Sequence, residues 1–218
     1  MFETMEEVKD KQEMKKTQVF NVIILDRSGS MCSIRDAAVS HLNECLQAIK
    51  SAQKEFAGQK HSVTIVTFNH MPKYLFINSD PELVNEITVN QYSPEGMTAL
   101  YDAIGSSVTE LKKVVKPGDK VLVSIITDGY ENSSREYSLQ AVKALIEETK
   151  AQGWTYTFMA ANIDERAVAA NLSINNVDSF EAETTAFACK SAGWSKLRHR
   201  YYSACDKGED SNENFFDE

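Results

Sequence analysis

Apolar residues recur along this chain in two spacings: short unbroken runs, and positions three or four residues apart. The runs are rich in β-branched side chains, which is typical of strands covered on both faces. The spaced positions are typical of helices with one apolar side. The strand-like runs are VFNVIIL (19–25), SVTIVTF (62–68), KVLVSIIT (120–127) and WTYTFMA (154–160), with a shorter one at 177–180.

Stretches with helical spacing lie between these runs. The longest has apolar positions from Val39 to Phe56 and ends before Gly58, a residue type that commonly terminates helices. A second helix is predicted from Leu100 to Val115, where Pro117 and Gly118 follow and stop it. Further helices are predicted around 139–146, 163–171 and 187–201, together with a short one capped by Ser79 or Asp80 ahead of Pro81.

One run predicts a strand at the edge of the sheet. KYLFI (73–77) follows the run at 62–68 after only NHMP, which is too short for a parallel crossover, so the two should pair antiparallel. The other strands alternate with helices, which predicts right-handed crossovers. We therefore expect an α/β fold: three layers, a doubly wound, mostly parallel sheet with one antiparallel edge strand, and helices on both faces.

Composition and charge suggest one domain with two charged ends. The 218 residues are 42% hydrophobic and 25% charged, as in ordinary globular domains. Residues 1–16 contain five acids and four lysines and are interpreted as a flexible arm. Residues 204–218 contain six acids and one lysine and are interpreted as a disordered acidic tail, with Phe215-Phe216 as a docking handle in the alternative. The domain itself is expected at 17–203.

The sequence also indicates a cytoplasmic setting. No apolar run approaches the roughly 20 residues that a membrane span needs, and the first 16 residues lack the apolar centre of a secretory signal. The body is only mildly acidic and has no basic stripe, which argues against nucleic-acid binding. We expect reduced thiols, because no zinc-binding spacing occurs among Cys32, Cys45, Cys189 and Cys205.

Two of the strand-like runs end on an aspartate that is followed by a turn. Asp26 opens DRSGS, with Ser28 and Ser30, and Asp128 lies in TDG. The turn EGMT adds the hydroxyl of Thr98. In open α/β sheets ligands bind outside the carboxyl ends of the strands, so we expect these five side chains to form one metal site. Hard oxygen donors favour Mg²⁺, with Mn²⁺ or Ca²⁺ as alternatives.

This combination closely resembles the von Willebrand factor type A (vWA) family, whose metal-ion-dependent adhesion site (MIDAS) is built on the same pattern. The matching segments are LDRSGSM (25–31), EGMTALYDAI (95–104) and IITDGYENS (125–133), and the order of elements agrees over roughly 17–200. The family often has two glycines before the threonine. Here Gly96-Met97 stands in their place, which should leave the threonine usable but alter the rim of the site.

The resemblance implies a role for each member of the cluster. Residues matching Ser28, Ser30 and Thr98 bind the cation directly through their hydroxyls in that family, and those matching Asp26 and Asp128 hold it through water. Neutral direct ligands leave the dication electrophilic, with a position open to a carboxylate of another protein. The resemblance therefore implies a metal-dependent protein–protein interaction module that accepts an Asp or Glu side chain.

The resemblance also suggests a setting for this module. The chain looks like the stand-alone intracellular type, whose relatives often act beside ATP-driven machines. The resemblance therefore implies a protein partner, with an ATPase-type assembly as its setting. No membrane partner is expected. In such domains the last helix can shift when ligand binds, and the segment around Phe187–Arg200 is the place for such a shift here.

An enzyme is the main alternative. A Mg²⁺-dependent phosphohydrolase or phosphate-binding protein of haloacid-dehalogenase-like topology would also have an aspartate after its first strand. Its chemistry needs a second carboxylate two residues later, where this chain has Ser28. The G-x-S-x-G elbow and the glycine-rich phosphate loops are absent. We therefore expect no catalytic residues and no enzymatic activity, and a scaffold that binds partners without metal is a weaker third reading.

Several residues beside the predicted site have two open roles, as contacts to a partner or as ordinary packing and loop residues. They are Met31, Met97, Tyr101, Tyr130, Glu131, Asn132 and Arg135. Of the four histidines, only His70 follows a strand end that approaches the same face.

Overall fold

The computed structural model describes residues 16–181, 184–209 and 215–216. Six strands form one sheet in the order β3-β2-β1-β4-β5-β6. Neighbouring strands are parallel except for β2 and β3, which are antiparallel. The fold class predicted from the sequence is therefore confirmed, including the antiparallel edge. The strands are β1 (Thr17–Asp26), β2 (Gln59–Phe68), β3 (Pro72–Ser79), β4 (Lys120–Thr127), β5 (Trp154–Ala160) and β6 (Asn176–Ser179).

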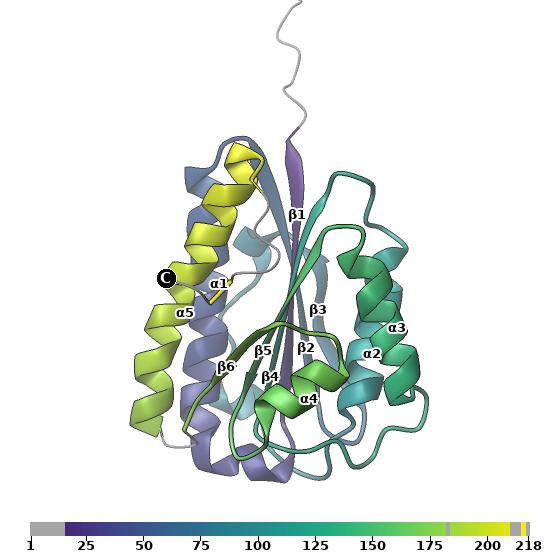
Figure 1. The fold of residues 1–218 in the computed structure, drawn as a ribbon. Coiled ribbons are helices and arrows are strands. Elements are labelled where there is room, and N and C mark those ends of the chain that lie inside the picture. Colours follow the sequence, from purple (N-terminus) through teal and green to yellow (C-terminus); the bar gives the residue numbers. More distant parts are fainter. Residues whose placement is uncertain (1–15, 182–183, 210–214, 217–218) are drawn as a thin grey trace, which may run out of the picture.

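Helices cover both faces of the sheet, with α1 and α5 on one side and α2 and α3 on the other (Figure 1). Within the described residues, none of them has the length and apolar character of a transmembrane span. The helices are α1 (Arg35–Glu55), α2 (Leu100–Lys112), α3 (Leu139–Lys150), α4 (Glu165–Asn171) and α5 (Thr184–Lys207), with short 3₁₀ segments η1 (Gly29–Ile34), η2 (Pro81–Leu83) and η3 (Val89–Gln91).

The apolar run at 22–25 in β1 follows from this sandwich of layers. Ile23 and Leu25 belong to the core cluster on the α1/α5 side. Val22 and Ile24 belong to the cluster on the α2/α3 side. All four side chains are buried, because a strand in the middle of a three-layer fold presents alternate residues to two apolar faces.

The strand order reverses at β1. β2 pairs with one edge of β1 and β3 pairs with β2, whereas β4, the next strand along the chain, pairs with the opposite edge of β1. β1 and β4 are parallel neighbours, with Leu25 opposite Ile126. Asp26 follows Leu25, and Asp128 comes two residues after Ile126, so both aspartates lie at the same edge of the sheet. This edge is the switch point of the strand order, where doubly wound sheets bind ligands.

The antiparallel edge contains an irregularity. The pairing of β2 with β3 shifts register between Val63 and Val66. On the β3 side Asn78 has φ of 45°, in the left-handed region that Asn tolerates better than most residues. Its backbone N–H donates to Thr64 Oγ1 at 2.9 Å. This hydroxyl holds a β-bulge in the edge strand.

Two local expectations differ from the structure. The short helix expected around Pro81 is the single 3₁₀ turn η2, in which the Asp80 carboxylate accepts the Glu82 N–H at 3.0 Å. At the other end of the chain, α5 continues to Lys207, beyond the boundary expected at 203. The 3₁₀ turn η2 does not extend into a longer helix because no amphipathic stretch follows Leu83 to bury a helical face.

The Phe215-Phe216 pair lies in the segment that the sequence suggested to be a solvated tail. Phe215 is only 5% exposed and belongs to the core cluster on the α1/α5 side. Its N–H donates to Asn176 Oδ1 at 3.0 Å, and its ring lies 6.3 Å from that of Tyr201. The expectation of a solvated pair is thus corrected, because burying an aromatic ring outweighs the polarity of its neighbours in sequence. The predicted arm at 1–16 lies almost wholly outside the described residues.

Candidate metal site

Asp26 anchors the site at the end of β1. Its side chain is fully buried, and its carboxylate accepts the Ser28 N–H at 2.7 Å and the Thr127 hydroxyl at 2.6 Å. The Tyr92 hydroxyl donates to the backbone carbonyl of Asp26. Burial raises the pKa of Asp26 to about 6, against the effect of these hydrogen bonds. The ionised form is therefore held in place by the chain but is poorly solvated.

The two serines connect this anchor to the second aspartate. Ser28 Oγ lies 3.0 Å from Ser30 Oγ, and Ser30 Oγ donates to Asp128 Oδ1 at 2.5 Å. Ser28 is buried whereas Ser30 is exposed, so the cluster reaches solvent at Ser30. Burial also raises the pKa of Asp128. The other carboxylate oxygen, Asp128 Oδ2, is buried and has no hydrogen-bond partner.

Gly129 marks the point where these segments converge. A Cβ atom at Gly129 would lie 3.2 Å from Thr98 Oγ1, 3.5 Å from Ser30 Oγ and 3.9 Å from Asp26 Oδ2. Side-chain oxygens from two distant segments, the serine loop and the EGMT turn, thus border one small space beside Gly129 that only a glycine leaves open. The structure brings all five predicted side chains together. Their role as metal ligands stays a prediction.

The loop that supplies Thr98 is fixed on two sides. On one side, Gly29 N–H donates to the Gly96 carbonyl at 3.1 Å, which joins the serine loop to the EGMT turn. On the other side, Asn132 Oδ1 accepts the Thr98 N–H at 2.8 Å, and the Asn132 N–H donates to the Thr98 carbonyl at 3.0 Å. Gly96 has φ of 76°, which explains why this turn retains a glycine.

Sequence reasoning missed residues that support the site. Thr127 holds Asp26; it lies in the quoted segment IITDGYENS, which was the available signal. Asn132, which the sequence left with an open role, holds Thr98. Two carboxylates accept backbone N–H groups that tie the loop after β4 to the start of α2: Glu131, which also had an open role, and Asp102, which lies unnoticed in the quoted segment EGMTALYDAI. Asp102 accepts from Arg135, Glu136 and Tyr137 at 2.8–2.9 Å, and Glu131 accepts from Tyr101, Ser133 and Ser134 at 2.7–2.9 Å.

The residues with open roles separate by exposure. Met31 is fully buried, so it packs and is not part of a rim. Met97 is 51% exposed and Tyr130 is 55% exposed. His70 is also exposed, and its Nδ1 lies 3.3 Å from where a Cβ of Gly96 would be. His70 therefore lies beside the EGMT turn, next to the oxygen cluster.

The donor set fits a hard divalent cation. The site offers two carboxylates and three hydroxyls. Elsewhere in the described part of the chain there is no competing site of the other common kind, a group of three or more His, Cys, Asp or Glu side chains placed to hold a metal. Oxygen donors suit Mg²⁺, Mn²⁺ or Ca²⁺ rather than zinc or copper. The unpartnered Asp128 Oδ2 and the open space at Gly129 are the features that such a cation would use.

Comparison with known proteins places the chain in a family. The von Willebrand factor type A domain family matches residues 22–196. The chain belongs to this family. The match covers the three segments that carry the predicted site and gives no support to the haloacid-dehalogenase alternative. A search of curated protein sequences finds no match.

Solved structures share the fold at low sequence identity. A von Willebrand factor type A protein from Catenulispora acidiphila matches with a TM-score of 0.61 and 14% identity, over 84% of this chain and 43% of that one. The pilus adhesin SpaC of Lactobacillus rhamnosus GG matches with 0.62 and 13%, over 88% and 31%. The manganese-loaded TRAP protein of Plasmodium vivax matches with 0.51 and 13%, over 80% and 71%. This vWA domain thus spans less than half the length of the first two.

Proposed function

We propose that this vWA domain is a metal-dependent protein-binding module. A divalent cation, Mg²⁺ by preference, is held at the cluster of Asp26, Ser28, Ser30, Thr98 and Asp128. The cation supplies a coordination position that an Asp or Glu carboxylate of a partner protein completes. The observation that best supports this is Asp128 Oδ2, a buried carboxylate oxygen without a hydrogen-bond partner, since such an atom in a native fold calls for an ion or a water.

The hydrogen bonds of the cluster support a division of roles. Both oxygens of Asp26 already accept hydrogen bonds from the chain, which fits an anchor that orients the site. The hydroxyls of Ser28, Ser30 and Thr98 are neutral, so they leave most of a dication's charge available to a partner's carboxylate. The manganese in the TRAP protein supports a divalent cation in this one.

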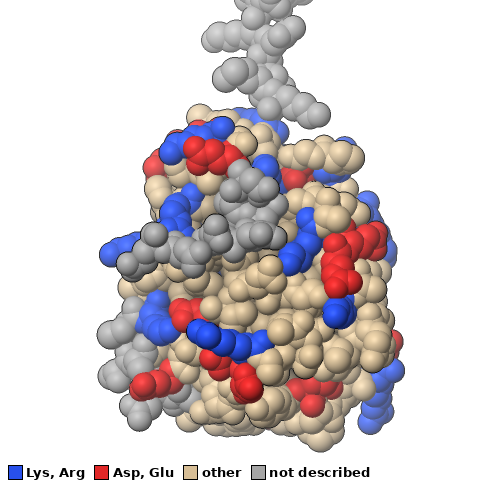
Figure 2. Space-filling model, in the orientation of Figure 1, with Lys and Arg blue, Asp and Glu red and all other residues tan. Residues whose placement is uncertain are grey.

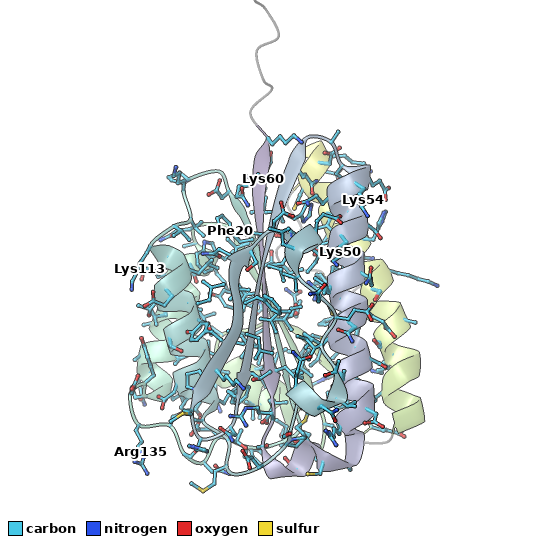
Figure 3. The ribbon with its side chains drawn as sticks, turned by 180° about the vertical axis from the view of Figure 1, so that it is seen from behind. Phe20, Lys50, Lys54, Lys60, Lys113 and Arg135 are labelled. Carbon is cyan, nitrogen blue, oxygen red and sulfur yellow. The ribbon has the colours of Figure 1, made fainter. Side chains whose placement is uncertain are left out.

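The surface beside the cluster supports a protein partner. A cavity of about 300 Å³ there is lined by His70, Met71, Met97 and Arg135, among others, and the two methionines are 56% and 51% exposed. Exposed methionines adapt to varied apolar partners. Arg135 points outward at this end of the molecule (Figure 3), and no ion pair of Arg135 occurs in the described residues.

The partner's wider setting is proposed on the resemblance alone. A cytoplasmic location and an ATPase-type assembly as partner are both proposals of this kind. On the face shown in Figure 2, basic and acidic side chains are interspersed, which is compatible with the expected absence of nucleic-acid binding.

Calorimetric titration with Mg²⁺ tests the metal site, using wild type, Asp128→Ala and the control Asp119→Ala. The control removes an aspartate from the loop before β4, at the opposite end of the sheet. We expect Mg²⁺ binding by wild type and by the control, and a loss of at least about 100-fold in Asp128→Ala, because an anchoring charge is removed. Equal Mg²⁺ affinity in Asp128→Ala and wild type would contradict the proposal.

The carboxylate-binding step needs a separate measurement. N-acetyl-aspartate amide and N-acetyl-asparagine amide differ only in charge and serve as probes for NMR titration of the labelled protein. With saturating Mg²⁺, the acidic probe should shift the amides of Gly29, Thr98 and Gly129, and the neutral probe should not. The shifts should vanish in chelator. Equal shifts with both probes would show that the site does not select a carboxylate.

A further inference from the structure

A second cavity lies at the opposite end of the sheet, where the parallel strands begin. Its volume is about 500 Å³, and its lining comes from the first residues of β1 and β2, the bulged part of β3 and the loop after α2. In Figure 3, Phe20 and Lys60 lie toward the end of the sheet where β1 begins, whereas Arg135 marks the end that carries the proposed metal site. The two sites are therefore separated by the length of the sheet.

Three lysines from three segments line this cavity: Lys16, Lys60 and Lys116. None of them has an acidic partner within 4 Å in the described residues. The chain carries a formal net charge of −9, so acidic groups are plentiful elsewhere. Three unpaired ammonium groups around one cavity are therefore a local excess of positive charge in an acidic protein.

The two aspartates of the lining are already engaged by the chain. Asp80 Oδ1 accepts the Glu82 N–H at 3.0 Å and the Gln53 amide at 3.1 Å; these bonds are the main cause of a lowered pKa at Asp80. Asp119 Oδ2 accepts the backbone N–H of Lys116 at 2.8 Å. Both carboxylates thus shape the walls. Lys60 is close enough to Asp80 to contribute to its lowered pKa, but no lysine of the lining lies within 4 Å of either carboxylate.

The floor of the cavity combines an unpartnered hydroxyl with apolar surface. Ser62 is 8% exposed, and its Oγ is buried without a hydrogen-bond partner. Phe20 lies beside Ser62 in the register of β1 and β2, so their side chains share a face. Val114, which is 43% exposed, adds apolar surface from the loop side. The bulge explains the free hydroxyl, since Asn78 bonds to Thr64 and not to Ser62.

We propose that this cavity binds a small organic anion, and that a phosphate monoester is the class that fits best. Ammonium groups from three directions match a doubly charged tetrahedral head better than a planar carboxylate, and lysine binds phosphate as a point charge. The Ser62 hydroxyl, whose oxygen is buried in the ligand-free protein, donates one further hydrogen bond to the head after rotation about χ1 turns it into the cavity. Phe20 and Val114 contact the apolar part of the ligand. The volume lies within the roughly 300–1,000 Å³ of small-molecule sites.

The test uses phenyl phosphate, inorganic phosphate and benzoate as probes in NMR titrations of the full chain. All samples contain chelator, so that the metal site makes no contribution. Phenyl phosphate should shift the amides of Lys60, Ser62 and Lys116 and bind at least about fivefold more tightly than either other probe, because each of those lacks the apolar part or the second charge. The affinity should fall as salt rises.

Variants decide whether the named residues carry the binding. Lys60→Ala combined with Lys116→Ala should weaken phenyl phosphate binding at least about tenfold, the scale of lost charge-assisted hydrogen bonds. Lys143→Ala is the matched control: it removes one lysine of α3 that pairs with Glu147 at 3.9 Å outside the cavity, and it should change nothing. Ser62→Ala should weaken binding about threefold without loss of folding.

The outcomes separate cleanly. Failure of all three probes to bind wild type, or equal affinity of the double variant and wild type for phenyl phosphate, overturns the proposal. If inorganic phosphate binds as tightly as phenyl phosphate, the proposed contact of Phe20 and Val114 with an apolar group is wrong. If benzoate binds more tightly than phenyl phosphate, the proposed preference for a phosphate monoester is wrong and the cavity selects a carboxylate. Because the experiment contains no divalent cation, its failure leaves the proposed metal site untouched.

Discussion

The two ends of the sheet show opposite arrangements of charge. At the carboxyl ends of β1 and β4, hydrogen bonds link Asp26 through Ser28 and Ser30 to Asp128. At the amino ends, Lys60 and Lys116 border a cavity and have no acidic partner within 4 Å in the described residues. The first end concentrates acids around a fixed small space, and the second leaves cations around a larger one.

The comparison shows how one sheet would separate the two proposed ligands. At the metal end the positions are set by short loops directly after the strands, which permits the precise spacing that a cation needs. At the other end long flexible side chains surround a cavity, which suits a ligand recognised by charge and size. Changes at one end should therefore leave the other unaffected, and the following experiments test this separation.

The largest effect is expected from Asp26→Asn. Mg²⁺ affinity should fall at least about 100-fold, because the anchoring charge is lost. The metal-free protein should nevertheless gain roughly 1–3 kcal/mol in free energy of unfolding at pH 7, since a buried carboxylate whose pKa is about 6 is ionised there at a cost. The Thr127 hydroxyl can turn to accept from the new amide while it donates to the Gly129 carbonyl, 3.2 Å away.

Calorimetry and urea denaturation in chelator measure the two quantities for Asp26→Asn. Phenyl phosphate affinity is the internal control and should not change. A variant that kept Mg²⁺ affinity within threefold of wild type, or that lost stability without metal, would show that Asp26 is not the buried, poorly solvated anchor described above.

A tenfold effect is expected from one added methyl group. Gly129→Ala places Cβ 3.2 Å from Thr98 Oγ1, in the space that the oxygens border, so Mg²⁺ affinity should fall about tenfold. The free energy of unfolding should change by less than about 1 kcal/mol. Gly193→Ala, where a Cβ meets nothing within 4 Å, is the control for adding a methyl group. Unchanged Mg²⁺ affinity in Gly129→Ala would mean that this space is not the metal position.

The smallest effect concerns the pH dependence of stability at the amino end. Burial lowers the pKa of His61 to about 4, below the ordinary value near 6.5 that it has when unfolded. The neutral ring thus contributes stability that is present above pH 6.5 and is lost as the pH falls toward 4. His61→Gln should reduce the loss of unfolding free energy over this window by roughly 1–2 kcal/mol.

Denaturation curves of wild type and His61→Gln in chelator at several pH values measure this difference. Asp26 acts in the opposite direction, because its raised pKa makes the metal-free protein lose stability as the pH rises from 3.8 to about 6. His41, whose pKa burial lowers to about 3, acts in the same direction as His61. Both groups are common to the two proteins and cancel in the comparison, so parallel curves would contradict the assignment to His61.

The sequence predicted the features that depend on local pattern. The alternation of runs and helices gave the layers, and the four-residue connection before 73–77 gave the antiparallel edge. The five oxygen residues lie within a few positions of strand ends or a glycine turn, so their convergence follows once β1 and β4 are neighbours. The family match at 22–196 adds support for the class of protein but not for the ligands themselves.

The remaining features depend on distances that a linear pattern does not contain. The bond from Thr127 to Asp26 requires the register of β1 against β4. The burial of Phe215 requires its contacts with Asn176 and Tyr201, which no local pattern indicates. The lysine-lined cavity requires the bulge at Asn78, and nothing in KYLFI distinguishes a bulged strand from a regular one.

The bulge has a consequence for the behaviour of this molecule among copies of itself. An open sheet invites another strand to join each free edge, and straight edges are the starting point of aggregation. On one side the shift at Asn78 breaks the regular ladder of β3. On the other side β6 is only four residues long. In the described part of the chain, both outermost strands are thus poor templates for edge-to-edge pairing with another copy.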